Sequence, residues 1–170
     1  MKTKYQYTKI GLAALLASLY GSSLTAATLN GTATATVIAP LLLAQTTVMS
    51  FGTVAVGAAG GTVVLDTAGA RTVTGDANAI AGGAGAAGVF TVNGANAQAY
   101  TMSIAPGVLS DGGGNTMGVG TYSYVAPALT GAAVSFNVGA TLTIGASQVA
   151  GAYSTANAGG TAVVVTANYN

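Results

Sequence analysis

The side chains that could do chemistry are few in this 170-residue chain, and they are widely spaced. Behind position 27 the charged residues are Asp66, Arg71, Asp76 and Asp111, and this part has no histidine, cysteine, glutamate, lysine or tryptophan. The usual general base, thiolate nucleophile, Schiff-base amine and glutamate pair are therefore missing. We expect no catalytic residue and no enzyme, because a hydrolase would have to work with the aspartates alone.

The four charged side chains also suggest no ligand site. Arg71 lies near Asp66 and Asp76 in the sequence, and we expect all three to be solvated turn charges, because exposed pairs contribute only about 0–1 kcal/mol. The loop from Asp111 to Asn115 offers one carboxylate where a calcium site needs several oxygens at fixed spacing. The sequence therefore predicts no metal site.

A glycine-rich run at 83–88, GAGAAG, matches the spacing of a dinucleotide fingerprint. That motif binds pyrophosphate only where a strand leads through it into a helix, whose first turn supplies the N–H groups. Here residues 89–92, VFTV, follow, and their composition is typical of a strand. We therefore expect no cofactor.

The first 27 residues have the organisation of an export signal. Three lysines before position 10 are followed by an apolar run at 10–20 and by small residues at 25–27. The run is shorter than the roughly 20 residues of a membrane-spanning helix, so we expect residues 1–27 to be a signal peptide that is cleaved after Ala27. Losing the three lysines changes the net charge from +1 to −2. No basic surface remains, and nucleic acid is not expected as a partner.

Residues 28–40, TLNGTATATVIAP, form an alternating arm behind this signal. Their period of two is that of a β-strand. Pro40 has no N–H to donate, so we expect a bend between the arm and the next strand. A free, β-prone arm can pair with its own domain's sheet or with a neighbour's. One face of the arm carries Leu29, Gly31, Ala33, Ala35, Val37 and Ala39.

Short strands and turn residues continue to the end of the chain. The longest alternation, at 134–144, places apolar residues on one side and polar ones on the other, as in an antiparallel sheet over a core. We predict one all-β domain at 28–170, an antiparallel β-sandwich, with no disulfide because cysteine is absent. A parallel β-helix would need a repeat period, which the sequence lacks. Other strands are expected at 53–56, 62–65, 71–74, 89–92, 100–104, 121–125 and 161–170, with a turn at 57–61. The strands at 62–65 and 71–74 would form a pair across residues 66–69, and those at 89–92 and 100–104 would follow one another across residues 93–96.

The order of four motifs resembles an uncharacterised family of secreted Ala/Gly/Thr-rich bacterial domains. The motifs are TATATVIA at 32–39, MSFGTV at 49–54, VGATLTIGA at 138–146 and VTANYN at 165–170. That family is similar to the spore-coat-protein-U-like fimbrial subunits, which a chaperone and an usher assemble. Those subunits commonly have a cysteine just behind the arm, where this chain has Pro40.

The resemblance implies an immunoglobulin-like, pilin-like sandwich with an N-terminal donor-type strand. The apolar face of the arm would fill the open groove of the next subunit, and the last strand would form the edge that docks on a chaperone. We therefore expect a structural subunit whose partners are copies of itself or related subunits, a periplasmic chaperone and an outer-membrane usher. It would pass through the periplasm to the cell surface or the medium. The expected chaperone and acceptor edge consists of Val163, Val165, Ala167, Tyr169 and Asn170.

The sequence leaves one alternative open. The arm could be the first strand of its own, complete sandwich. The protein would then be a self-complete adhesion or matrix module that binds a polysaccharide or a cell surface. Four tyrosines would stack on sugar rings if they gathered on the outside, namely Tyr100, Tyr122, Tyr124 and Tyr153.

Overall fold

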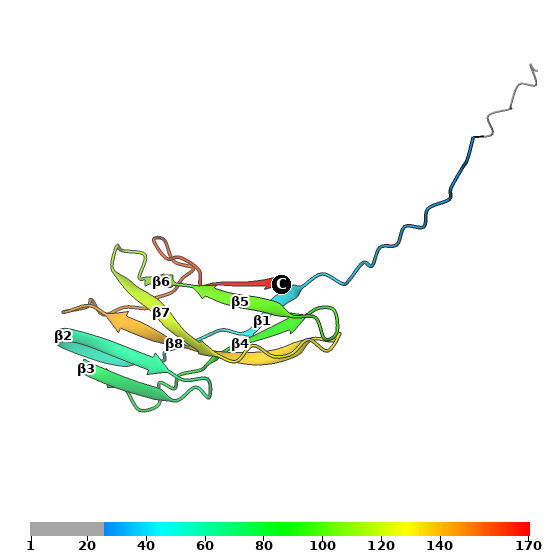
Figure 1. Cartoon of the computed structure of the whole chain (residues 1–170). Coiled ribbons are helices and arrows are strands. Elements are labelled where there is room, and N and C mark those ends of the chain that lie inside the picture. The colour runs from blue at the N-terminus through cyan, green and yellow to red at the C-terminus, as the bar shows by residue number, and fades with distance from the viewer. Residues whose placement is uncertain (1–25) are drawn as a thin grey trace, which may run out of the picture. The chain divides into compact units, whose positions relative to one another are not determined.

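The computed structural model describes residues 26–170 (Figure 1). Nearly all of the predicted signal peptide, residues 1–25, lies outside the described residues. The chain divides into two units after Thr36. In the first unit, residues 26–36 belong to no strand and all are exposed. The second unit, Val37–Asn170, contains every strand that the structure describes.

The second unit is built from β-strands that are all paired antiparallel, which confirms the predicted all-β class. No helix occurs between residues 26 and 170, so none of this part could cross a membrane as a helix. The strands are β1 Leu42–Thr47, β2 Val54–Leu65, β3 Arg71–Ala79, β4 Gly88–Asn93, β5 Tyr100–Ala105, β6 Gly107–Ser110, β7 Thr116–Tyr124, β8 Val134–Ile144 and β9 Val164–Tyr169.

The long alternation predicted at 134–144 becomes β8, the centre of a seven-stranded sheet. Its first half pairs with β4 and its second half with β2, while β7 pairs along its opposite edge, so that Leu142 lies between Val63 and Val119. From there the sheet extends through β4 to β1, through β2 to β3, and through β7 to β6. The second sheet contains β5 and β9 alone.

Two clusters of buried side chains form the core, and β8 contributes to both. The first lies around Val63 and Leu65 of β2, which are fully buried. In the second, Phe90 of β4 stacks on Phe136 of β8 with ring centroids 5.9 Å apart. Inward side chains of β5 and β9 pack on this second cluster, which joins the small sheet to the large one.

The turn predicted at 57–61 is wrong, because these residues lie inside β2. The pairing of β2 with β3 shifts there, from Val56 opposite Ala77 to Gly61 opposite Gly75. Gly60 has φ +76°, which glycine adopts at no steric cost. The glycines therefore accommodate a bulge within a long strand and do not reverse the chain.

The hairpin predicted from 62–65 and 71–74 is confirmed as the pairing of β2 with β3. The strands predicted at 89–92 and 100–104 also exist as β4 and β5, but they lie in different sheets. The last strand is shorter than predicted, because Thr161 still pairs with Val108 of β6 before β9 begins. Local alternation indicates strands but carries no information on distant partners.

Candidate functional site

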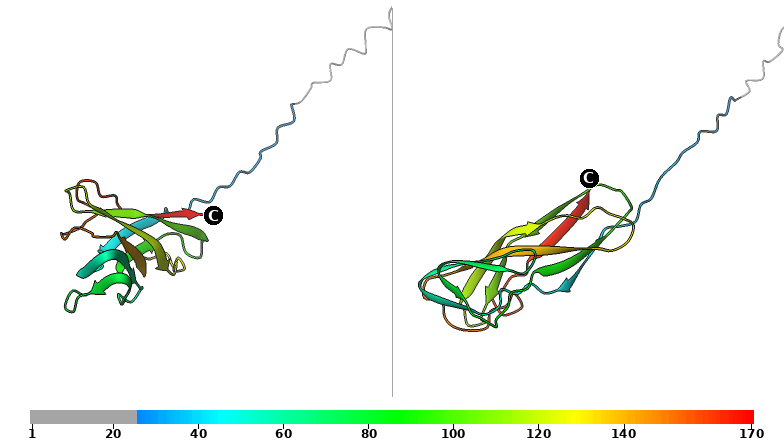
Figure 2. Two further views of the ribbon diagram at one scale, coloured as in Figure 1. Left: turned by 90° about the vertical axis from the view of Figure 1, so that its left-hand side faces the viewer. Right: turned by 90° about the horizontal axis from the view of Figure 1, so that it is seen from below.

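Two strands that each pair along one edge only, β1 with β4 and β9 with β5, define an open side in the second unit. Strand pairing continues from β1 through β4, β8 and β7 to β6. In the sequence β5 comes directly before β6, and only Pro106 separates the two strands. β5 then pairs with β9, which Figures 1 and 2 show in red beside it. Among the described residues no ladder or isolated bridge joins β9 to β1. We call the space between the unpaired edges of β1 and β9 the open side.

Contacts at both ends show that these two edges border the same space. At one end the Tyr169 hydroxyl donates to the carbonyl of Ala39, just before β1, at 2.8 Å. The same hydroxyl accepts the Ala95 N–H at 2.7 Å. At the other end Met49, just behind β1, and Val163, just before β9, line one cavity. The open side therefore extends from Tyr169 to this cavity.

Side chains along the open side are only half buried. The inward positions of β4 are buried, and Val92 is 0% exposed. In β9 each inward position is only partly buried and each outward one is exposed. Leu43 of β1 is also only partly buried, and it packs on the second cluster together with Val165. The core is therefore incompletely covered where β1 and β9 face each other.

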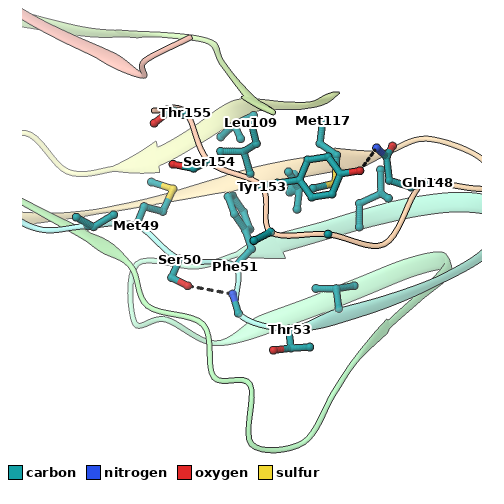
Figure 3. A pocket seen from close by; sticks show the side chains of 18 of the residues that line it. Met49, Ser50, Phe51, Thr53, Leu109, Met117, Gln148, Tyr153, Ser154 and Thr155 are labelled. Carbon is teal, nitrogen blue, oxygen red and sulfur yellow. Dashed lines mark hydrogen bonds between the residues drawn. The ribbon is translucent and has the colours of Figure 1, made fainter. Parts of the chain in front are cut away.

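The cavity at the end of the open side has a volume of about 1030 Å³ (Figure 3). Apolar side chains from both halves of the fold line it, among them Phe51, Leu109 and Ile144. Val48 and Val149, which also line it, are 74% and 53% exposed. Exposed apolar side chains at the rim of a hollow are typical of a binding surface.

One wall of the cavity is the strand-free segment at 148–155. Ser110 of β6 holds the segment in place, because its hydroxyl donates to Ala158 O at 2.7 Å and its N–H to Ser154 O at 3.0 Å. The Asn157 amide donates to Ser110 O at 2.7 Å. Within the wall, the Gln148 amide donates to the Tyr153 hydroxyl at 2.9 Å. This wall is thus fixed by hydrogen bonds to a distant strand.

Arg71 fixes the opposite wall. Its guanidinium donates to the carbonyls of Phe51 at 3.1 Å, Thr53 at 3.0 Å and Ile80 at 3.2 Å. Gly52 between the first two has φ +69°, and a Cβ there would collide with the Gly83 carbonyl. The predicted solvated charge is wrong for Arg71, which binds main-chain carbonyls and is half buried.

The aspartates also bind main-chain groups. Asp66 Oδ1 accepts the N–H groups of Ala68 and Ala70 at 2.9 and 2.8 Å and so closes the β2–β3 turn. Asp76 Oδ2 accepts the Ala59 N–H at the bulge of β2, at 2.9 Å. Both aspartates are exposed, as predicted for solvated charges, and in addition they hold a turn and a bulge in place.

Asp111 organises the glycine-rich loop behind β6. Its carboxylate accepts the Asn115 side-chain N–H at 2.6 Å and the Gly113 N–H at 2.7 Å. The bond from the Asn115 side chain lowers the pKa of the Asp111 carboxyl below its usual value. Between residues 26 and 170 no three metal-ligating side chains come together. The loop thus satisfies its one carboxylate internally.

Three of the four tyrosines considered for sugar stacking point to the core. The hydroxyls of Tyr100, Tyr122 and Tyr124 donate to the carbonyls of Pro127, Val119 and Met102, and their rings pack against the core clusters. Burial raises the pKa of Tyr100, which nearby Tyr124 raises further, and burial also raises the pKa of Tyr122. Tyr153 differs from them, because it lines the cavity (Figure 3).

The residues predicted for the two partners in assembly differ in exposure. On the arm, residues 28–40 are all exposed, with Leu29 at 95% and Val37 at 94%. On the predicted edge, Val163, Val165, Ala167 and Tyr169 face inward and are half buried, and the Asn170 N–H donates to Ala99 O at 3.2 Å. The sequence could not indicate the contacts of Tyr169, Arg71 and the segment at 148–155, because their partners are distant or lack a motif.

A family model matches most of the chain. The family model described as "Domain of unknown function (DUF4402)" matches residues 41–169, which include all nine strands. No curated protein and no solved structure matches the chain. The matched segment contains the open side and the cavity, and it begins directly behind the arm.

Proposed function

The chain belongs to the DUF4402 family of domains of unknown function, and we propose that it is an exported, non-enzymatic structural subunit that polymerises by strand donation. In this function the arm of one copy lies along β9 of the next copy and fills its open side. The product is a fimbria-like surface filament. The observation that carries the proposal is the open side itself, since two unpaired strand edges border an incompletely covered core.

An added strand matches what the open side offers. An extended segment that joins a sheet edge gains main-chain hydrogen bonds, and its alternate side chains enter the groove. β9 presents such an edge, and the strand-free arm presents small side chains on one face of its predicted alternation. Monomeric sheet proteins usually guard an edge with lysine, proline or an inward charge. Residues 164–169 contain none of these.

The length of the arm also supports the proposal. At about 3.3 Å per residue, residues 29–37 span about 30 Å and the six residues of β9 about 20 Å. The arm can therefore cover all of β9 and continue to the cavity. Its central positions Gly31, Ala33 and Ala35 are small, which suits a shallow groove between two strands.

The proposal also includes the type of sandwich. We infer an immunoglobulin-like, pilin-like sandwich that lacks one strand, as the resemblance to spore-coat-protein-U-like subunits implies. A periplasmic chaperone would cover the open side until an outer-membrane usher brings the next subunit. Tyr169 and Asn170 would belong to the docking edge, since both lie at the end of β9.

The test uses the protein without residues 1–27. Deleting residues 28–39 should leave a folded monomer that forms no polymer, which sedimentation and electron microscopy would detect. A matched pair refines this test: Ala33→Asp places a charge on the row predicted to enter the groove, whereas Thr34→Asp places it on the other row. We expect the first to abolish polymers and the second to retain them. Normal filaments from the deletion variant would refute strand donation.

One observation supports the alternative function, polysaccharide binding. Tyr153 and Gln148 lie together at the wall of the large cavity, where an aromatic ring and an amide could contact a sugar. Binding of oligosaccharides to the armless monomer, lost in Tyr153→Ala, would favour this function. An armless monomer that binds no glycan would leave assembly as the better explanation.

A further inference from the structure

The junction between the arm and β1 determines whether the open side is filled by the chain's own arm or by the arm of another copy. This inference rests on the proposed function. To enter its own open side, the arm would have to reverse direction near Pro40 and pair with β1. The inward residues of β1 and its approach are Leu41 and Leu43, which pack on the second cluster, whereas Leu42 is 59% exposed. The loop length of the reversal decides which face of the arm points inward.

A two-residue loop would turn the wrong face inward. Directly opposite residues of an antiparallel pair share one face of the sheet. A loop of Ala39 and Pro40 would pair Ile38 with Leu41 and Thr36 with Leu43. The arm would then direct its threonines to the core and its alanines to solvent. Lengthening the loop by one residue shifts the register by one and exchanges the two faces. A four-residue loop shifts it by two, so the threonines again point to the core.

A three-residue loop would turn the correct face inward but needs a backbone that Pro40 cannot adopt. It would consist of residues 38–40 and pair Val37 with Leu41. Such loops are classically a type I turn followed by a residue in the left-handed conformation. That residue would be Pro40, whose ring holds φ near −65°. A five-residue loop would move Val37 out of the groove and put β-branched residues in the turn.

The observed junction agrees with these constraints. Residues 37–40 contain no turn, and the Ala39 carbonyl accepts the Tyr169 hydroxyl at 2.8 Å. The residue before a proline is also restricted to extended conformations. Tyr169 and Pro40 therefore both favour an extended backbone at Ala39, where a reversal would need a turn.

We propose that Pro40 prevents the arm from closing on its own domain and so leaves the open side to residues 29–37 of a second copy of this chain. The arm supplies the correct row of side chains, but it can present that row only to another subunit. Pro40 is thus a residue that selects the partner, although it contacts no groove itself. Because the arm does not pair with its own domain, the open side of each folded subunit stays available to another copy.

Pro40→Gly tests this proposal, with Pro40→Ala as its matched control. Glycine accepts the left-handed conformation freely, whereas alanine there costs about 1–2 kcal/mol. Both changes remove the ring, and position 40 is exposed, so both variants should fold. Hydrogen exchange of the amides at 32–37 is measured by mass spectrometry at a concentration where the protein is monomeric, and assembly is measured separately by sedimentation.

We expect the arm of the wild type and of Pro40→Ala to exchange freely in the monomer. In Pro40→Gly the same amides should exchange more slowly by about tenfold or more, as for a paired strand. This variant should also assemble less. An arm that is protected in the wild-type monomer, or that exchanges as freely in Pro40→Gly as in the wild type, would overturn the proposal.

The two readouts separate this inference from the proposed function. A wild-type protein that never assembles, with a free arm that Pro40→Gly protects, would refute polymerisation but support the role of Pro40. A wild-type protein that assembles while Pro40→Gly assembles equally, with an equally free arm, would refute the role of Pro40 but retain polymerisation.

Discussion

Two regions that contact the same buried cluster, the sheet around β8 and the edge along β9, differ in how completely strands surround them. Around β8, three strands pair with one central strand, and Val138 is 0% exposed. In contrast, β9 pairs along one edge only, with β5. Its inward residues Val165 and Tyr169 are half buried. The side chains are similar, but the number of paired edges differs. The comparison shows that the open side results from the unpaired edge of β9. Its side chains are not more polar than those of β8.

Core truncations should show the largest contrast between the two regions. Phe136→Ala removes a buried ring that stacks on Phe90, and such changes cost about 3–5 kcal/mol. Leu43→Ala, at the half-covered edge of β1, should cost clearly less in the monomer. Chemical denaturation of both variants in the armless protein measures the difference. Equal losses would show that the open side is as well packed as the region around β8.

Arg71 should matter next, because it fixes the cavity end of the open side. Arg71→Met keeps much of the apolar stem but loses the bonds to the three carbonyls, and we expect a loss of about 2 kcal/mol in unfolding free energy. Arg71→Lys should recover only part of this, since a compact ammonium cannot span three acceptors. Full recovery by lysine would mean that charge alone matters. Thermal and denaturant unfolding provide the measurement.

Tyr169 links the two edges of the open side at its other end. Tyr169→Phe leaves the ring in place but removes the bonds to Ala39 O and Ala95 N–H, and we expect a loss of about 1–2 kcal/mol. Exchange of the Ala95 amide should become faster. A control, Tyr153→Phe, removes a hydroxyl at the cavity wall and should leave that amide unchanged. If both variants exchange alike, the tyrosine does not connect the edges.

The smallest expected effect is a pH dependence in the alkaline range. The pKa values of Tyr100 and Tyr122 are raised in the folded protein, so the folded state keeps protons that the unfolded state loses. Their contribution to stability is complete below the unfolded pKa of about 10 and decreases as pH rises above it. Denaturation between pH 8 and about 11 tests the sign. The double variant Tyr100→Phe/Tyr122→Phe should show a weaker decrease.

Most of the strands could be predicted from the sequence because alternation is local, although β6 was missed. The apolar row at 134–144 lies against the core as predicted. The hairpin of β2 and β3 was also predictable, because its turn lies between its strands. The bulge at 57–61 was not, since glycine is equally compatible with a turn and with a bulge.

The sequence by itself determined an all-β protein whose chemistry-bearing side chains are few, because period-two patterns and composition depend on no distant contact. Only the tertiary structure decided that β1 and β9 remain unpaired on one side and that Tyr169 reaches the Ala39 carbonyl. It also decided that the sole arginine behind position 27 holds a turn and does not pair with an aspartate. These features join residues up to 130 positions apart. Strand pairing over such separations depends on how the whole chain packs, and a local pattern does not contain it.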